Sequence, residues 1–269
     1  MKIYGLLLFV FLTIGYASPY IKILAPVQGT LFNNQSIYVG KIAPGETFYL
    51  SADANTTNYN GSYVTYGWNL MKPINLPNGW IGAASKLYEN PLIIKITVSS
   101  NASYGIYKIP IEVINIGNYS KVGNLTFYAI VNVTNKIFNV SIEERNLSSG
   151  IGEPVPITLN VSNLGIANDT FAISVYNLPS NLSTNEYIIY YSKSNDLKYY
   201  VYANQIGKYN FILHLYSTTS PNISYYYNLT LNIRPSLTND INSIDNGLIE
   251  YPEIFEPIYA LIDILKRLI

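Results

Sequence analysis

The clearest alternation of hydrophobic and polar positions lies in residues 151–179. After a turn at Gly152-Glu153, apolar residues occupy every second position over 157–161, and polar residues fill the positions between them. This period of two is typical of a β-strand with one buried and one exposed face. Turn residues at 163–165 interrupt the pattern, and a second alternation follows over 171–175. The stretch therefore predicts two strands that pair as a hairpin.

The same alternation recurs along most of the chain. It predicts strands over 21–26, 36–42, 48–54, 92–98, 106–115, 125–135, 138–144, 186–192, 197–203, 209–217 and 225–233. Residues 55–63 are polar and rich in turn formers, which predicts an exposed loop. Trp68 and Trp80 flank a proline-containing segment, and we expect them to pack in or beside a core. The alternative for Trp80 is an exposed ring that stacks on a sugar.

Short landmarks occur twice, in the same order, at offsets of 102 to 107 residues. This repetition indicates two copies of one module, each the size of an Ig-like sandwich, at 18–136 and 137–235. Two unrelated β domains with common turn chemistry are the alternative. The pairs are Gly45-Glu46 with Gly152-Glu153, Leu76-Pro77 with Leu178-Pro179, Gly105-Ile106-Tyr107 with Gly207-Lys208-Tyr209, and Asn124-Leu125-Thr126 with Asn228-Leu229-Thr230.

The succession of Gly-Glu, alternating strand, Asn-x-Gly, second strand and Pro in 151–179 resembles CARDB-type modules, the cell adhesion related Ig-like domains of extracellular and archaeal surface proteins. The resemblance implies an Ig-like β-sandwich used as a spacer or adhesive unit. Together with the cysteine-free composition rich in Asn, Ile and Tyr, it also favours an archaeal origin. The expected fold class is all-β, with two tandem Ig-like antiparallel β-sandwiches followed by a C-terminal amphipathic helix.

The N-terminus has the outline of a secretory signal peptide. Lys2 precedes an apolar run at 3–14, and Gly15 and Ala17 are small residues at the positions before a cleavage site. We expect residues 1–17 to be removed, so that the mature chain begins at Ser18. An uncleaved N-terminal membrane anchor is the alternative, although the run is shorter than the roughly 20 residues that span a bilayer.

The C-terminal tail differs from everything before it. Residues 236–247 are a polar linker, and 248–269 hold a short amphipathic helix that could begin at Pro257. Such a short helix is marginal alone in water, so we expect its apolar stripe to contact an envelope protein or the membrane surface, with the second sandwich as the alternative. The stripe consists of Ile258, Leu261, Ile262, Leu265 and Leu268.

Composition adds a low charge and a high tyrosine content. Charged residues make up 12% of the chain, about half of the usual share, and the formal net charge is zero. This balance gives no electrostatic reason to expect nucleic acid as a partner. Cysteine is absent, so disulfides and thiolate metal sites are excluded.

The N-glycosylation sequon N-x-[ST] occurs 14 times, more often than chance pairing of these residue types gives. Strands with Asn and Thr on their polar face generate part of this excess. Few charged residues are present to keep the chain soluble, and attached glycans would supply that solubility. We therefore expect N-glycosylation, with candidates Asn34, Asn55, Asn60, Asn101, Asn118, Asn124, Asn132, Asn139, Asn146, Asn160, Asn168, Asn181, Asn222 and Asn228.

Residues for catalysis or metal binding are sparse. His214 is the sole histidine and has no Ser or Asp motif around it, which favours a packed or edge position. The carboxylates at 143–144 and 250–256 are not spaced as a catalytic pair. The Asp- and Asn-rich segment 240–246 lacks the glutamate that closes a calcium loop. We expect no enzyme activity, cofactor or metal site.

These observations favour a non-enzymatic, secreted, N-glycosylated surface protein with a structural or adhesive role, attached through its C-terminal helix. The alternative is a carbohydrate-binding or accessory module of an extracellular assembly, with polysaccharide as its partner.

Overall fold

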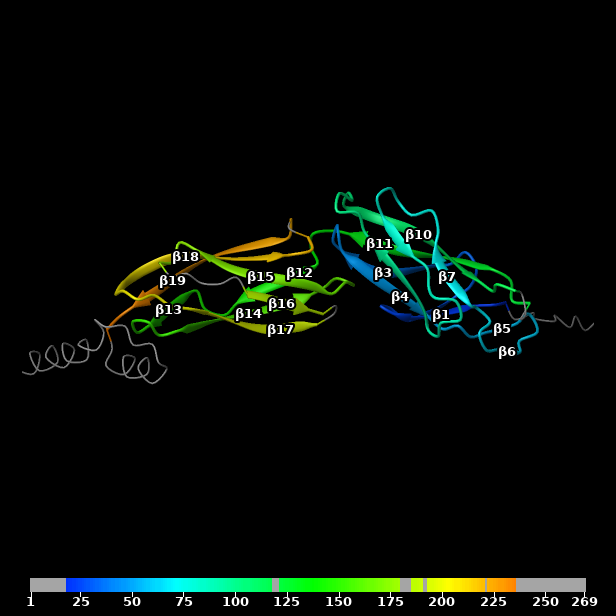
Figure 1. The fold of residues 1–269 in the computed structure, drawn as a ribbon, viewed down its shortest axis with the longest axis horizontal. Coiled ribbons are helices and arrows are strands. Elements are labelled where there is room, and N and C mark those ends of the chain that lie inside the picture. Colours follow the sequence, from blue (N-terminus) through cyan, green and yellow to red (C-terminus); the bar gives the residue numbers. More distant parts are fainter. Residues whose placement is uncertain (1–17, 118–120, 180–184, 191–192, 221, 236–269) are drawn as a thin grey trace, which may run out of the picture.

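The computed structural model describes residues 18–117, 121–179, 185–190, 193–220 and 222–235. Every regular element in these ranges is a strand, so the all-β prediction is confirmed for this part of the chain. The strands form two sandwiches that lie end to end along the long axis of the molecule (Figure 1). The signal peptide, linker and helical tail predicted from the sequence lie outside the described residues.

In the first sandwich, one sheet has the order β2-β1-β4-β9-β8 and the facing sheet the order β3-β11-β10-β7. Its core includes Trp68, whose indole N–H donates to the Tyr20 carbonyl at 3.1 Å. A separate two-stranded pair, β5 and β6, lies at one end. The strands are β1 (Ile21–Ala25), β2 (Gly29–Leu31), β3 (Ser36–Ile42), β4 (Thr47–Ala52), β5 (Thr56–Thr57), β6 (Tyr63–Val64), β7 (Leu70–Pro73), β8 (Ile81–Ala83), β9 (Leu92–Thr97), β10 (Gly105–Ile114) and β11 (Leu125–Val133).

The second sandwich has the sheets β12-β14-β17 and β13-β19-β18-β15-β16. The hydroxyls of Tyr225 and Tyr227 donate to the carbonyls of Phe138 and Val140, both at 3.0 Å, and so tie the two sheets together along one side. The strands are β12 (Phe138–Ile142), β13 (Asn146–Ser149), β14 (Val155–Asn163), β15 (Asp169–Tyr176), β16 (Asn185–Ile189), β17 (Ser194–Val201), β18 (Gly207–Ser217) and β19 (Ser224–Ile233).

The two sandwiches share one topology. In each, an early strand pairs in parallel with the last strand (β3 with β11, β13 with β19), and the next strand crosses to the other sheet (β4, β14). The turns of Gly45 and Gly152 stand at this same crossing. Both glycines have positive φ, and in both turns the glutamate carboxylate accepts the backbone N–H three residues earlier. This strand order is that of an Ig-like sandwich.

Each sandwich also has a tyrosine corner, which is a hallmark of Ig-like folds. The Tyr107 hydroxyl donates to the Ser103 carbonyl at 2.8 Å, and the Tyr209 hydroxyl donates to the Gln205 carbonyl at 2.9 Å. Both tyrosines stand two residues after a strand-opening glycine. The repeated Gly-x-Tyr landmark in the sequence is therefore the repeated corner.

We expect Tyr107→Phe or Tyr209→Phe to destabilise its own sandwich by about 1 kcal/mol, because each removes one tertiary hydrogen bond and keeps the ring. Denaturant unfolding of the single variants measures this cost. Tyr200→Phe is the matched control, since its ring is 51% exposed. Equal effects of all three substitutions would contradict a special role for the corners.

Three expectations from the sequence are wrong in detail. Strands β14 and β15 do not form a hairpin: β14 pairs with β12 and β17, and β15 pairs with β16 and β18 in the facing sheet. The connection crosses between sheets because both strands direct their apolar faces into one core. Asn163 shapes this crossing, since its side chain accepts from Gly165 N and donates to the Ala167 carbonyl.

The Asn-Leu-Thr landmark is out of register by four residues. The Tyr107 and Tyr209 corners face Val131 and Leu231 across β10–β11 and β18–β19, so the equivalent of Asn124 is Ser224 and not Asn228. The segment 55–63, predicted to be a loop, contains part of the β5–β6 pair, and Thr56 is fully buried.

Candidate functional site

The two sandwiches interlock where they meet. Ala43 belongs to the first sandwich by sequence but is fully buried in the second core, while Ile166 and Ala167 pack against the first core. Ile166 N donates to the Lys41 carbonyl at 2.9 Å, and the Ser220 hydroxyl donates to the Pro44 carbonyl. This reciprocal exchange makes the joint a packed interface rather than a flexible linker.

Two glycines permit the close approach at the joint. A Cβ on Gly40 would lie 2.4 Å from Cγ2 of Ile166, and a Cβ on Gly45 would lie 3.1 Å from the Thr219 carbonyl oxygen. Both glycines have φ values, +143° and +85°, that residues with side chains rarely adopt. Any larger residue at Gly40 must therefore displace Ile166 or distort the backbone.

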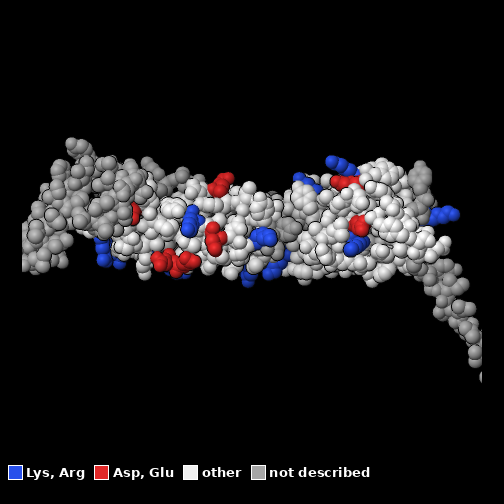
Figure 2. All heavy atoms as spheres, turned by 90° about the horizontal axis from the view of Figure 1, so that it is seen from below, with Lys and Arg blue, Asp and Glu red and all other residues white. Residues whose placement is uncertain are grey.

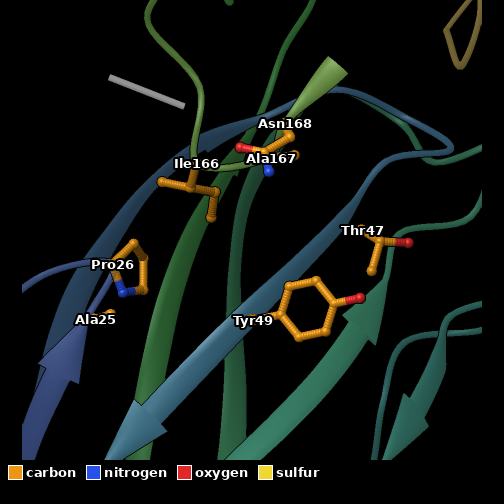
Figure 3. A pocket seen from close by; sticks show the side chains of 7 residues that line it. All are labelled: Ala25, Pro26, Thr47, Tyr49, Ile166, Ala167 and Asn168. Carbon is orange, nitrogen blue, oxygen red and sulfur yellow. The ribbon is translucent and has the colours of Figure 1, made fainter. Parts of the chain in front are cut away.

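A cavity of about 360 Å³ opens beside the joint (Figure 3). Residues 25–26 and the side chains of Thr47 and Tyr49 line it from the first sandwich, and residues 166–168 line it from the second. The lining offers a phenol, a hydroxyl and an amide, which can form hydrogen bonds. It contains no acid, base or cation, so it does not provide a nucleophile with a general base.

Two buried carboxylates face the joint from opposite sandwiches. Glu46 is 1% exposed and Asp169 is 2% exposed, and one oxygen of each, Glu46 Oε1 and Asp169 Oδ2, has no hydrogen-bond partner. The pKa of Glu46 is raised to about 8, mainly by burial and further by the charge of Asp169. The hydrogen bond from Ala43 N acts in the opposite direction and lowers this pKa. Burial also raises the pKa of Asp169, which the hydroxyls of Ser217 and Thr219 partly offset.

Sequence reasoning missed this pair. The two residues are far apart in the chain, and period-two patterning assigns positions to faces without saying which ends of two modules meet. A signal was nevertheless present, since Glu46 lies in a repeated Gly-Glu turn whose copy, Glu153, is only half-buried.

The predicted acceptor asparagines are accessible to solvent wherever the structure describes them. Nine of the twelve described positions are exposed, three (Asn55, Asn132 and Asn160) are half-buried, and none is buried. Two of those three have engaged amides: Asn55 Nδ2 donates to Asp53 and Asn160 Nδ2 donates to Asp196. Asn118 and Asn181 lie outside the described residues, as do the predicted contact positions of the helix, 258–268.

Trp68 and Trp80 both lie in the first core, as expected from the sequence. Trp80 is only 8% exposed and packs at 5.1 Å from the Tyr107 ring, so the alternative of an exposed, sugar-stacking Trp80 is wrong. His214 instead lies within an outward-facing row of stacked rings. We call Tyr176, His214, Tyr216 and Tyr226 the aromatic row. The centroids of the three tyrosine rings lie 4.3–5.7 Å from the centroid of the His214 ring.

Charged side chains are scattered along the molecule. Figure 2 shows basic and acidic residues interspersed on one face without a broad field of either sign. Glu143 and Glu144 are both exposed. Within the described ranges, no three His, Cys, Asp or Glu residues lie close enough to hold a metal ion. No helix in those ranges is long and apolar enough to cross a membrane.

Comparisons with known proteins give no family. No family model matches the chain. No curated protein matches it. Among solved structures, it is similar to the fibronectin(III)-like modules of Clostridium thermocellum CbhA, with 12% identity and a TM-score of 0.28 over 80% of this chain and 94% of that one. A chimeric titin Z1Z2 carrying an exogenous decorin peptide gives 11% identity and a TM-score of 0.37 over 82% and 100%. These likenesses are too weak to argue from, so the Ig-like architecture is assigned from the strand order and the two tyrosine corners.

Proposed function

We propose that this protein is a non-catalytic, exported surface protein that serves as a stiff, N-glycosylated spacer. The observation that carries the proposal is the accessibility of all twelve described sequon asparagines, spread over both sandwiches of a chain with few charges. Glycans at these positions would cover the polar faces of the sheets and supply the solubility that ionic groups provide elsewhere. The resemblance to CARDB-type modules agrees with such a role.

The joint supports the spacer part of the proposal. Two modules joined by a loose linker would sample many angles, whereas reciprocal burial of Ala43 and Ala167 favours one arrangement. The result is a single elongated body (Figure 1), suited to holding its two ends apart. In this proposal the C-terminal helix of 248–269 attaches one end to an envelope protein or to the membrane surface.

The protein isolated from cells that produce it should be found in the envelope fraction, begin at Ser18, and yield glycopeptides from most sequons. Peptide mass spectrometry of that fraction checks all three features. Removing 248–269 should release a folded protein into the medium. Removing 18–30 should not release a folded protein, because it deletes strand β1. A cytoplasmic protein with intact Met1 and bare sequons would refute the proposal.

Binding of an external polysaccharide is a second candidate function. One observation favours it, which is the aromatic row on the outer face of the second sandwich, where Tyr226 is 64% exposed and Tyr176 is 48% exposed. Aromatic ring faces are apolar and electron-rich, and sugars present C–H-bearing faces that suit them.

A further inference from the structure

Strand β19 places an acceptor asparagine beside an exposed aromatic ring. Along this strand Leu229 is buried, so the residues on either side of it face outward. Tyr226 and Asn228 are exposed and Thr230 is half-buried, all on this outer face. The sequon Asn228-Leu229-Thr230 is therefore preceded, two residues earlier on the same face, by a tyrosine.

One face of the Tyr226 ring is left open. Its other face stacks on His214, with ring centroids 4.3 Å apart and planes 6° from parallel. The only described strand on the far side of β19 is β13, and it pairs with residues 230–233 alone. No described strand therefore runs beside Tyr226 on that side, which agrees with the 64% exposure of its side chain.

We propose that the first sugar of a glycan on Asn228 docks over the open face of the Tyr226 ring, on the side of β19 that points away from β18. The C–H face of a pyranose ring suits the apolar face of the tyrosine ring. The inference rests on the proposed glycosylation and goes beyond it. It makes one glycan a packed part of the second sandwich, while glycans at other sequons extend into solvent.

The absence of cysteine makes a direct test possible. In the unglycosylated full chain carrying Asn228→Cys, a haloacetamide of N-acetylglucosamine attaches one sugar through a thioether. We expect the conjugate to unfold at a temperature about 3–8 °C higher than the unconjugated variant. The sugar protons should also shift upfield in NMR spectra, because they lie over an aromatic ring.

Two variants give the controls. Asn146→Cys places the same sugar at an exposed sequon of the same sandwich with no aromatic residue two positions earlier, and it should show neither effect. Adding Tyr226→Ser to Asn228→Cys should abolish both effects, and the ring it removes is exposed, so the sandwich should stay folded. Equal gains at 146 and 228, or no gain at 228, would overturn the docking.

The outcomes for this inference and for the proposed function can be told apart. Bare sequons in the native protein would refute the glycosylation, whereas an occupied Asn228 whose conjugate gains nothing would refute only the docking. Saturable binding of a free polysaccharide by the unmodified chain, lost in Tyr226→Ser, would assign the surface to an external ligand and would overturn the inference.

Discussion

At pH 8 a Glu46→Gln variant should be more stable than the wild-type protein, by as much as about 4 kcal/mol, whereas at pH 5 the two should differ by about 1 kcal/mol or less. The reason is the burial of this carboxyl group in the joint. Its pKa is raised from 4.5 to about 8, first by burial and then by the charge of Asp169. An amide keeps the acceptor for Ala43 N and carries no charge.

The sign of the pH dependence follows from linkage. The folded protein holds the Glu46 proton more tightly than the unfolded chain, so the stabilisation is complete below pH 4.5 and is lost as the pH rises to about 8. The pKa of Asp169 is also raised, so this residue too makes the folded protein less stable as the pH rises, beginning at a lower pH than Glu46. Denaturant unfolding of wild type and variant between pH 4 and 9 measures both curves.

Glu153→Gln is the matched control. Glu153 makes the same turn in the second sandwich, where its carboxylate accepts from Gly150 N at 3.2 Å, but it lies away from the joint and is half-buried. Its substitution should leave the fall in stability between pH 5 and 8 in place. If Glu46→Gln declined with pH as steeply as the wild type, the buried carboxyl would not be the cause.

Strands long enough to show several alternations could be predicted from the sequence. Residues 125–133 alternate between buried and half-buried positions without a break, and the predicted range of 125–135 ends within two residues of the observed strand. Strands β2, β8 and β13 were missed because three or four residues contain at most two alternations. Burial within one strand depends on local pattern, and that is why the all-β prediction holds.

The sequence pattern does not predict which strands pair or which ends of the two sandwiches meet. The period of β14 and β15 assigns a buried face to each strand, but a facing pair across a core and a hydrogen-bonded hairpin share that pattern. The four-residue register error at Asn124 has a similar origin, since alternating strands look alike when shifted by an even number of residues. The approach of Glu46 to Asp169 depends on how two finished sandwiches dock, which no local pattern encodes.

Gly40→Ala should loosen the joint between the sandwiches. The new methyl group would overlap Ile166 Cγ2, because an ideal Cβ lies 2.4 Å from that atom, and the backbone φ of +143° is unfavourable for alanine. Overpacking and backbone strain of this kind each cost about 1–3 kcal/mol. We expect a lower free energy of unfolding and a wider range of orientations between the sandwiches.

Spin labels in the cysteine-free chain measure that range. Labels on Lys95→Cys in β9 and Lys198→Cys in β17, both exposed, report one distance across the joint. The distribution should be narrow in the parent chain and broad when Gly40→Ala is added. A pair within the second sandwich, Lys198→Cys with Asn210→Cys, should stay narrow in both.

A double-mutant cycle separates the clash from the backbone strain. Ile166→Ala removes the atom that the new methyl group meets but leaves φ at residue 40 unchanged, so Gly40→Ala should cost about 1–3 kcal/mol less in the Ile166→Ala background than in the wild type. A coupling energy near zero would mean that Gly40 and Ile166 do not meet in solution. The interlocked joint, and with it the proposed stiffness of the spacer, would then be refuted, while the two Ig-like sandwiches themselves would stand.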